Sequence, residues 1–232
     1  MHLRPPSTKA FSLIEILASI AIVGVLAALI VSGVSKAKAT AQSAGCVTNM
    51  RNLGLAINLY ASDHNGSLPP EDGLGLWLSA NAVSGDDPAQ LVYYFQQATG
   101  DRTPTGQVVK GFACPAALAA YPNLKKPSDP NSSMAIYSLN RTVGFPGREP
   151  FGFFGAVYPA MKLIRVQSEA IKSEDPRKDQ RWLVQEADQQ GGCTASWDSP
   201  MFPVKPVHGD FRHRLALDGH VERLSLRDSE IE

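Results

Sequence analysis

The sequence is poor in cysteine and carries no excess of charge of either sign. Its 232 residues hold three cysteines, Cys46, Cys114 and Cys193, and no two of them form a C-x-x-C pair. This count excludes a disulfide-dense scaffold, and the spacing argues against a structural zinc site. Lysine and arginine together number 22, as do aspartate and glutamate. A protein that binds nucleic acid through a basic surface normally shows an excess of cations, so no nucleic-acid partner is inferred.

The frames of the common catalytic motifs are also missing. The sequence contains no G-x-S-x-G, H-E-x-x-H, P-loop or G-x-G-x-x-G pattern. These patterns are typical of hydrolases, metallopeptidases and nucleotide-binding enzymes. We therefore expect a protein that is not an enzyme and needs no cofactor.

The apolar residues are concentrated near the N-terminus. Residues 11–34 (FSLIEILASIAIVGVLAALIVSGV) contain a single charge, Glu15. A helix of this length spans about 36 Å, which is enough to cross a hydrocarbon core of about 30 Å. Arg4 and Lys9 precede the stretch without any acid, which favours a cytoplasmic N-terminus, although two lysines after the stretch weaken that signal.

Two simple interpretations of this stretch are open. A secretory signal peptide would be cut after the small-x-small pattern at 37–39, but the apolar run at 16–34 is longer than the roughly 7–15 residues of a typical signal core. A plain membrane anchor would explain the length but not Glu15, because a carboxylate in a spanning segment costs roughly 2.5–3.5 kcal/mol.

The residues around Glu15 favour a third interpretation. Residues 8–15 (TKAFSLIE) present a basic residue, a small residue, an aromatic residue and an acid in that order. This segment resembles the processing site of type IV pilins and type II secretion pseudopilins, whose mature chains begin with an aromatic residue and carry glutamate at the fifth position. The family usually has glycine before the cut, so Ala10 is a departure for which we expect slower processing at worst.

The resemblance implies that a prepilin peptidase cuts between Ala10 and Phe11 and N-methylates Phe11. The new α-amino group is largely cationic near neutral pH. In a bundle of such helices, Glu15 would neutralise the Phe11 amine of a neighbouring subunit. The implied partners are the peptidase-methyltransferase, other pilin or pseudopilin subunits, an inner-membrane assembly platform and membrane lipid. The N-terminus would lie in the bacterial cytoplasm and the head in the periplasm.

The apolar helix is predicted to continue as a stem. Apolar residues spaced three and four apart form one helical face: Val47, Met50, Leu53, Ile57 and Tyr60. Asn65-Gly66 marks the end of this pattern. The predicted organisation is a cleaved leader at 1–10, a transmembrane helix at 11–34, an amphipathic stem at 35–65 and a head at 66–232.

The predicted fold class is α+β and pilin-like, with the long helix packed on a small antiparallel sheet. Segments 134–139, 181–186, 212–217 and 220–226 are predicted strands, and 158–173 is ambiguous between helix and strand. Asp218-Gly219 separates the last two strands and is the dipeptide of a two-residue type I′ turn, which predicts a half-buried C-terminal hairpin.

The hairpin carries a second resemblance. His208 and Asp218-Gly219 are separated by nine residues, and this H-x9-DG pattern resembles the C-terminal signature of prepilin-like proteins in several bacterial phyla. His213 and Ala216 stand where that signature commonly has an asparagine and an aromatic residue. His208, Asp210 and Asp218 are also candidate metal ligands, with calcium considered by analogy with some pseudopilins. Asp218 is most simply a turn residue.

Cys114 and Cys193 both fall in the expected periplasmic head, where an oxidising environment would allow them to form a disulfide. Two separate buried thiols are the alternative, and Cys46 is expected to be a small packing residue of the stem. The prediction is a structural subunit of a type IV pilus-like or type II secretion pseudopilus filament. The alternative is a single-pass, membrane-anchored periplasmic binding or metal-dependent module.

Overall fold

The computed structural model describes residues 12–69, 91–104, 109, 111, 113–121, 125–126, 129–133, 137–139, 160–172, 174, 181–186, 188 and 203–225. The predicted cleavage site, Ala10 and Phe11, lies outside the described residues, as does Cys193. The chain divides into two compact units, Met1–Ala41 and Gln42–Glu232.

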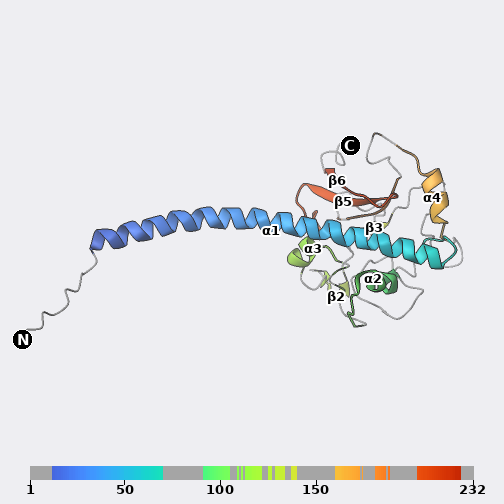
Figure 1. Cartoon of the computed structure of the whole chain (residues 1–232), viewed down its shortest axis with the longest axis horizontal. Coiled ribbons are helices and arrows are strands. Elements are labelled where there is room, and N and C mark those ends of the chain that lie inside the picture. The colour runs from blue at the N-terminus through green and yellow to red at the C-terminus, as the bar shows by residue number, and fades with distance from the viewer. Residues whose placement is uncertain are drawn as a thin grey trace, which may run out of the picture. The chain divides into compact units, whose positions relative to one another are not determined.

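A single helix, α1 (Leu13–Asp63), holds 51 residues and confirms the long N-terminal helix predicted from the sequence (Figure 1). It ends where two residues adopt left-handed backbone conformations, Asn65 with φ of 54° and Gly66 with φ of 80°. The Gly66 N–H donates to the Ala61 carbonyl oxygen at 2.7 Å and closes the last turn. Asn65-Gly66 therefore ends the helix as predicted, because glycine and asparagine tolerate this conformation best.

The described elements of the second unit are short. Its helices are α2 (Leu91–Thr99), α3 (Pro115–Ala120) and α4 (Leu163–Glu169), and α4 shows that the ambiguous segment at 158–173 contains a helix. A four-stranded antiparallel sheet has the order β3 (Tyr137–Leu139), β4 (Trp182–Glu186), β5 (Phe211–Ala216) and β6 (Val221–Ser225). A separate pair joins β1 (Lys125–Lys126) and β2 (Asp129–Ser133). The fold is α+β.

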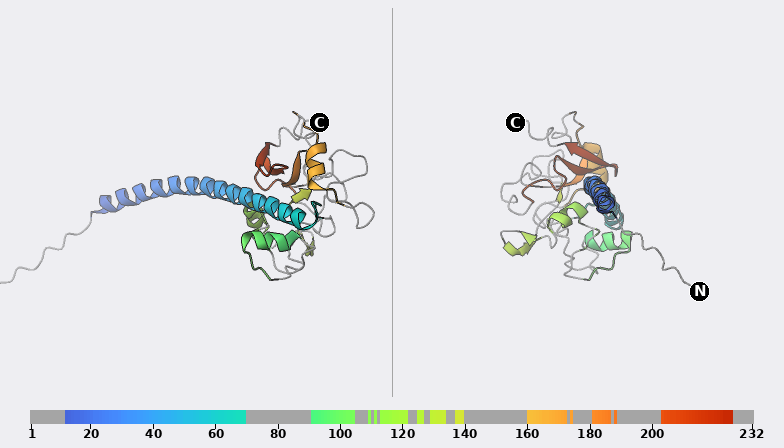
Figure 2. Two further views of the ribbon diagram at one scale, coloured as in Figure 1. Left: turned by 45° about the vertical axis from the view of Figure 1, so that its right-hand side comes forward. Right: turned by 90° about the vertical axis from the view of Figure 1, so that its left-hand side faces the viewer.

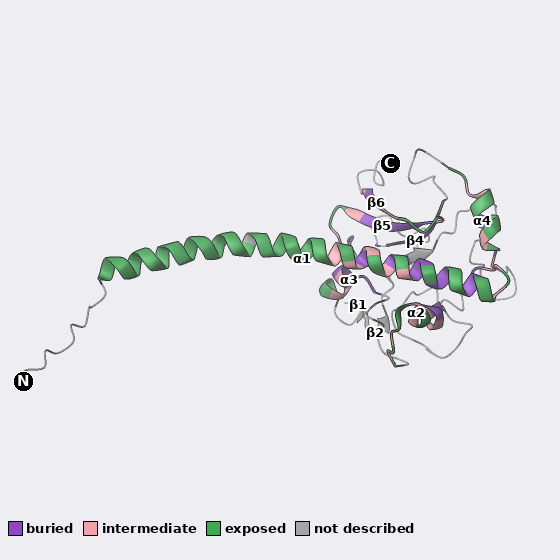
Figure 3. Cartoon of the chain, in the orientation of Figure 1, coloured by how far each residue is buried: buried purple, intermediate pink, exposed green. Residues whose placement is uncertain are grey.

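The part of α1 from residue 42 onward lies between the sheet on one side and α2 and α3 on the other (Figures 1 and 2). Four of the five apolar residues of the predicted stem face are buried there, Met50, Leu53, Ile57 and Tyr60, and the fifth, Val47, is half-buried. Figure 3 shows that buried and exposed positions alternate along this part of α1. The prediction of an apolar face at helical spacing is confirmed, and this face forms the centre of the hydrophobic core.

Two glycines allow α1 to approach its neighbours closely. A Cβ atom at Gly45 would stand 2.9 Å from the Cγ of Pro115 in α3. A Cβ atom at Gly54 would stand 3.1 Å from a methyl group of Leu215 in β5. These positions fix the distance of α1 from α3 and from the sheet, since a larger residue at either one would push them apart.

The turn between β5 and β6 differs from the prediction. The Ala216 N–H donates to the His220 carbonyl oxygen at 2.9 Å, and the Gly219 N–H donates to the Ala216 carbonyl oxygen at 3.0 Å. Within this turn only Gly219 has positive φ, at 88°. The loop therefore has three residues, 217–219, with glycine in the left-handed position, whereas a two-residue type I′ turn needs positive φ at both central residues.

The expectation of a half-buried hairpin was also wrong for β5. Its residues from Arg212 to Ala216 are all buried, so both faces of this central strand are covered. The polar side chains on this strand have acidic partners: Arg212 pairs with Asp188, and Arg214 Nε donates to the Glu222 carboxylate at 2.7 Å. Buried charges are tolerated where such partners satisfy them.

Candidate functional site

The N-terminus of α1 places Glu15 in a capping arrangement. The Ser12 N–H donates to the Glu15 carboxylate at 2.8 Å, and the Glu15 N–H donates to the Ser12 carbonyl oxygen at 3.0 Å. S-x-x-E is the capping-box pattern, in which the third helical residue returns to the residue that precedes the helix. Glu15 therefore has a role in capping the helix in addition to the expected role in assembly. The S-x-x-E spacing in the sequence is a signal that could have predicted it.

The first part of α1 presents an apolar surface that nothing in its own unit covers. Every residue from Ser12 to Ala41 whose side chain is described is exposed. The large apolar side chains in the segment are each at least half exposed: Leu13, Ile14, Ile16, Leu17, Ile20, Ile22, Val23, Val25, Leu26, Leu29, Ile30, Val31 and Val34. An 18-residue window of α1 reaches a mean hydropathy of 2.7, and by length and composition the helix can cross a membrane.

His208, the first residue of the H-x9-DG signature, belongs to a buried polar cluster with Glu186 and His213. Glu186 ends β4, His208 lies before β5, and His213 lies within β5. His208 Nε2 and Glu186 Oε1 are 3.1 Å apart, with each side chain 4% exposed. The His213 N–H donates to Glu186 Oε2 at 2.8 Å, and His213 Nδ1 lies 3.2 Å from the same oxygen. One carboxylate thus holds both imidazoles in place.

The cluster also reaches the stem helix. Ser43 Oγ in α1 lies 3.2 Å from His213 Nε2. On the other side, Cys114 Sγ lies 3.4 Å from His208 Nε2. His213 stands where the resembled signature commonly has asparagine, and here it links the sheet to α1 through its ring.

Two opposing effects act on the pKa of Glu186. Burial by itself would raise the pKa of this carboxyl group. The hydrogen bonds from His208 and His213, together with their charges, outweigh burial and hold the pKa of Glu186 below its usual value of 4.5. The carboxylate is therefore the ionised partner around which the two imidazoles are arranged.

The structure corrects both expectations for Cys114, the possible pairing with Cys193 and the alternative of a separate buried thiol. Cys114 forms a disulfide with Cys46 of α1, and their Cα atoms are 4.5 Å apart. Cys46 is buried at the point where α1 meets the start of α3, so it faces Cys114 rather than serving only as a packing residue. The disulfide joins the stem helix to the head across 68 residues of sequence.

The three candidate metal ligands of the signature have separate partners. His208 contacts Glu186, Asp210 lies 3.4 Å from the Arg223 guanidinium, and Asp218 accepts from His220. Asp210 and Asp218 are exposed, whereas the His208 side chain is buried. The structure therefore does not show the three as one group, and it assigns Asp218 to the turn.

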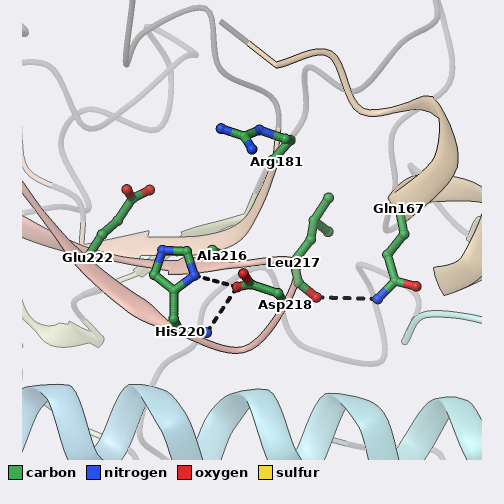
Figure 4. A pocket seen from close by; sticks show the side chains of 7 residues that line it. All are labelled: Gln167, Arg181, Ala216, Leu217, Asp218, His220 and Glu222. Atoms are coloured by element: carbon green, nitrogen blue, oxygen red, sulfur yellow. Dashed lines mark hydrogen bonds and ion pairs between the residues drawn. The ribbon is translucent and has the colours of Figure 1, made fainter. Parts of the chain in front are cut away.

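A hollow of about 340 Å³ opens beside this turn. Its lining includes Arg181, Asp218, His220 and Glu222, as Figure 4 shows. Gln167 of α4 reaches across and donates to the Leu217 carbonyl oxygen at 3.3 Å. Both signs of charge line the hollow. One described contact, from Gln167 to Leu217, joins α4 to the hairpin, and the contacts between His220 and Asp218 lie within the hairpin itself.

Asp218 offers a pH test of the turn. The hydrogen bond from the His220 backbone N–H, followed by contacts with the His220 ring, lowers the pKa of Asp218 below 3.8. Because the folded pKa is depressed, ionised Asp218 stabilises the turn above pH 3.8, and this contribution is lost as the pH falls through the folded pKa. We expect an NMR titration of the Asp218 carboxyl carbon to show a midpoint below 3.8.

The variant His220→Ala is the matched control for this titration. It keeps the backbone donor and removes the ring, so the midpoint should rise only part of the way toward 3.8. A wild-type midpoint at or above 3.8 would contradict the assigned hydrogen bonds.

Comparison with known families finds one match. Residues 6–31 match a family model described as the prokaryotic N-terminal methylation motif. Searches of curated proteins and of solved structures found no match. The matched segment contains Ala10, Phe11 and Glu15 and extends over most of the exposed apolar part of α1. The motif supports a type IV pilin-like protein that is a substrate of a prepilin peptidase, with an apolar helix that fits membrane anchoring.

Proposed function

We propose that the chain is a structural subunit of a type IV pilus-like or type II secretion pseudopilus filament. A prepilin peptidase removes residues 1–10 and methylates Phe11, and the subunit then assembles through its apolar helix. The observation that carries the proposal is the methylation motif at residues 6–31, which includes Glu15 and overlaps the exposed apolar part of α1.

The exposed side chains of the helix support this assignment. A row of large apolar residues over residues 13–34 is stable only where lipid or other apolar helices cover it. Before assembly the bilayer covers this surface, and in a filament the helices of neighbouring subunits replace the lipid. Gly24 and Gly33 have no neighbouring atoms within 4 Å of an added Cβ, so each leaves room for a close helix contact.

Glu15 gives the assembly its register in this proposal. Cleavage frees the Phe11 amine, and a cation next to the carboxylate of a neighbouring subunit removes the cost of an isolated charge in lipid. The capping bond from Ser12 to Glu15 occupies one side of the carboxylate. A carboxylate accepts several hydrogen bonds, so the capping bond and the ammonium can be held together.

The disulfide supports placing the head in the periplasm. Disulfides such as Cys46–Cys114 persist in oxidising compartments and are rare in the cytoplasm of mesophiles. The basic residues before α1 favour leaving the N-terminus in the cytoplasm. We propose an inner-membrane subunit with a cytoplasmic N-terminus and a periplasmic head that performs no catalysis.

Mass spectrometry of the N-terminus tests processing. In cells that possess a prepilin peptidase, we expect the isolated chain to begin with N-methylated Phe11 and to lack residues 1–10. A chain that begins at Met1 would instead favour the membrane-anchored binding module, and one that begins at Thr40 would favour ordinary secretion. Either of those two results overturns the proposal.

A glutamine at position 15 separates the two roles of the acid. Glu15→Gln keeps a side chain that can form the capping box but removes the charge. If Glu15 pairs with a neighbouring amine, incorporation of Glu15→Gln into filaments should fall by about tenfold or more, since each 1.4 kcal/mol of lost pairing is a factor of ten. Incorporation is measured by shearing filaments from cells and quantifying the subunit.

The control for this experiment is Glu174→Gln, which changes an exposed acid of the head and should leave incorporation unchanged. Leader cleavage is followed in the same samples, because an uncut chain would fail to assemble for another reason. If Glu15→Gln is cut and incorporated like the wild type, Glu15 serves the capping box alone and the charge-pairing model is wrong.

A further inference from the structure

Four potential metal ligands from distant parts of the chain meet where α1 joins the head. They are Cys46 in α1, Cys114 before α3, Glu186 at the end of β4 and His208 before β5. Their ligand atoms all lie within 4.8 Å of one another. Both cysteines and Glu186 are buried, and the His208 side chain is 4% exposed. Two sulfurs, one imidazole nitrogen and one carboxylate oxygen thus form a compact set of donors.

We propose that the reduced protein binds one Zn²⁺ ion through these four residues. Zinc in proteins takes four ligands in a tetrahedron, with bonds of about 2.3 Å to thiolate and about 2.0–2.2 Å to imidazole and carboxylate. Donor atoms around such an ion stand roughly 3.3–3.8 Å apart. The four ligand atoms already lie within 4.8 Å of one another, so each needs to shift by only about 1 Å to surround the ion. The two sulfurs move apart in this change, because they are no longer bonded to each other.

The chemistry of the donors selects zinc over the calcium considered from the sequence. Calcium takes six to eight oxygen ligands. Among these four residues only Glu186 offers oxygen. Soft thiolate sulfur with imidazole favours zinc among the common divalent ions. The absence of a C-x-x-C pair in the sequence does not exclude this site, because its two cysteines come from separate segments of the chain.

His213 positions the carboxylate for this role. Its backbone N–H holds Glu186 Oε2 at 2.8 Å, which leaves Glu186 Oε1 directed at His208. Glu186 would therefore coordinate through Oε1 while Oε2 keeps its hydrogen bond. Partners of this kind orient metal ligands and raise metal affinity.

The disulfide and the metal exclude each other. In the oxidised protein the Cys46–Cys114 bond occupies both sulfurs. A dithiol reductant supplies two electrons and two protons, breaks the S–S bond to give two thiols, and leaves as its own cyclic disulfide. Zn²⁺ then displaces the two thiol protons as it binds the thiolates. The reverse exchange, with an oxidised dithiol, reforms the Cys46–Cys114 bond and releases the ion.

Either state therefore fastens α1 to the start of α3 at the same point. In a reducing environment zinc would hold the joint, and in an oxidising one the disulfide would hold it. This inference is independent of filament assembly, since all four residues belong to the unit Gln42–Glu232.

The test uses the full-length protein in detergent, reduced with a phosphine in the presence of Zn²⁺. The phosphine takes oxygen from water as it converts the disulfide to two thiols. After excess metal is removed on a desalting column, we expect about one zinc per reduced chain and almost none per oxidised chain. Replacing Zn²⁺ by Co²⁺ should give a thiolate-to-cobalt charge-transfer band together with the visible absorption of a tetrahedral ion.

His208→Asn and Glu186→Gln remove one ligand each and should weaken zinc binding by about tenfold or more. Each variant is first checked by circular dichroism in its oxidised form, where the disulfide holds the joint. His220→Asn changes an exposed histidine outside the set and should bind zinc like the wild type. The proposal is overturned if the reduced protein retains no zinc, if the oxidised protein retains as much, or if His208→Asn and Glu186→Gln have no effect.

Discussion

Replacing Asp188 by alanine should lower the free energy of unfolding by about 3–5 kcal/mol. The Asp188 carboxylate accepts hydrogen bonds from Arg212 Nε at 2.6 Å and Nη2 at 2.8 Å, and both side chains are 1% exposed. The variant leaves the Arg212 guanidinium charge in the interior without this carboxylate. At about 2–4 °C per kcal/mol for a protein of this size, the melting temperature should fall by about 6–20 °C, measured by circular dichroism in detergent.

Asp210→Ala is the matched control for Asp188→Ala. It removes an aspartate that lies 3.4 Å from Arg223, but the Asp210 side chain is 82% exposed and the Arg223 side chain 61% exposed, so solvent screens the pair. We expect a change within about 0.5 kcal/mol. The double variant Asp188→Leu with Arg212→Met removes both buried charges and should recover much of the stability. Equal melting temperatures for Asp188→Ala and Asp210→Ala would contradict the ion-pair assignment.

The location of this ion pair was not predictable from the sequence. Residues 211–216 (FRHRLA) contain three basic or ionisable side chains, a composition that indicates a strand with one face in water. Arg212 is buried because Asp188 meets it, and His213 because Glu186 meets it. Both acids lie more than twenty residues earlier, Glu186 at the end of β4 and Asp188 two residues beyond it, and the pairing of β4 with β5 brings this segment beside Arg212 and His213.

The elements set by local sequence were predicted well. The apolar run and the spacing of Met50, Leu53 and Ile57 predicted α1, and Asn65-Gly66 predicted its end to within two residues. Local signals also decided the existence of the hairpin at Asp218-Gly219. Its turn type was predicted wrongly because the same dipeptide also fits a three-residue loop, and the pairing of Ala216 with His220 selects between the two.

Contacts between distant segments account for the remaining errors at the site. The environment suggested a disulfide, but the choice of partner for Cys114 depended on how α1 packs beside α3. Gly45 permits that packing, since a Cβ there would stand 2.9 Å from Pro115, next to Cys114 in sequence. A glycine in a helix indicates that a neighbouring element can approach closely, but the sequence alone does not identify that element.

Removing the disulfide should be about as costly as breaking the buried ion pair. The Cys46–Cys114 link joins residues 68 apart, and in the chain-entropy model a cross-link of this length contributes about 4 kcal/mol by restricting the unfolded chain. We expect the double variant Cys46→Ala with Cys114→Ala to melt about 8–16 °C below the wild type. Melting is followed in the presence of a metal chelator, so that zinc cannot replace the link in any sample.

Cys193→Ala separates this pairing from the one that the sequence suggested. If Cys114 is bonded to Cys46, Cys193→Ala keeps the link and its melting temperature stays close to that of the wild type. A peptide map without reductant should then contain a fragment that joins Cys46 to Cys114. If Cys193→Ala destabilises the protein as much as the double variant does, or if the map joins Cys114 to Cys193, the stem is held to the head by packing and the polar cluster alone.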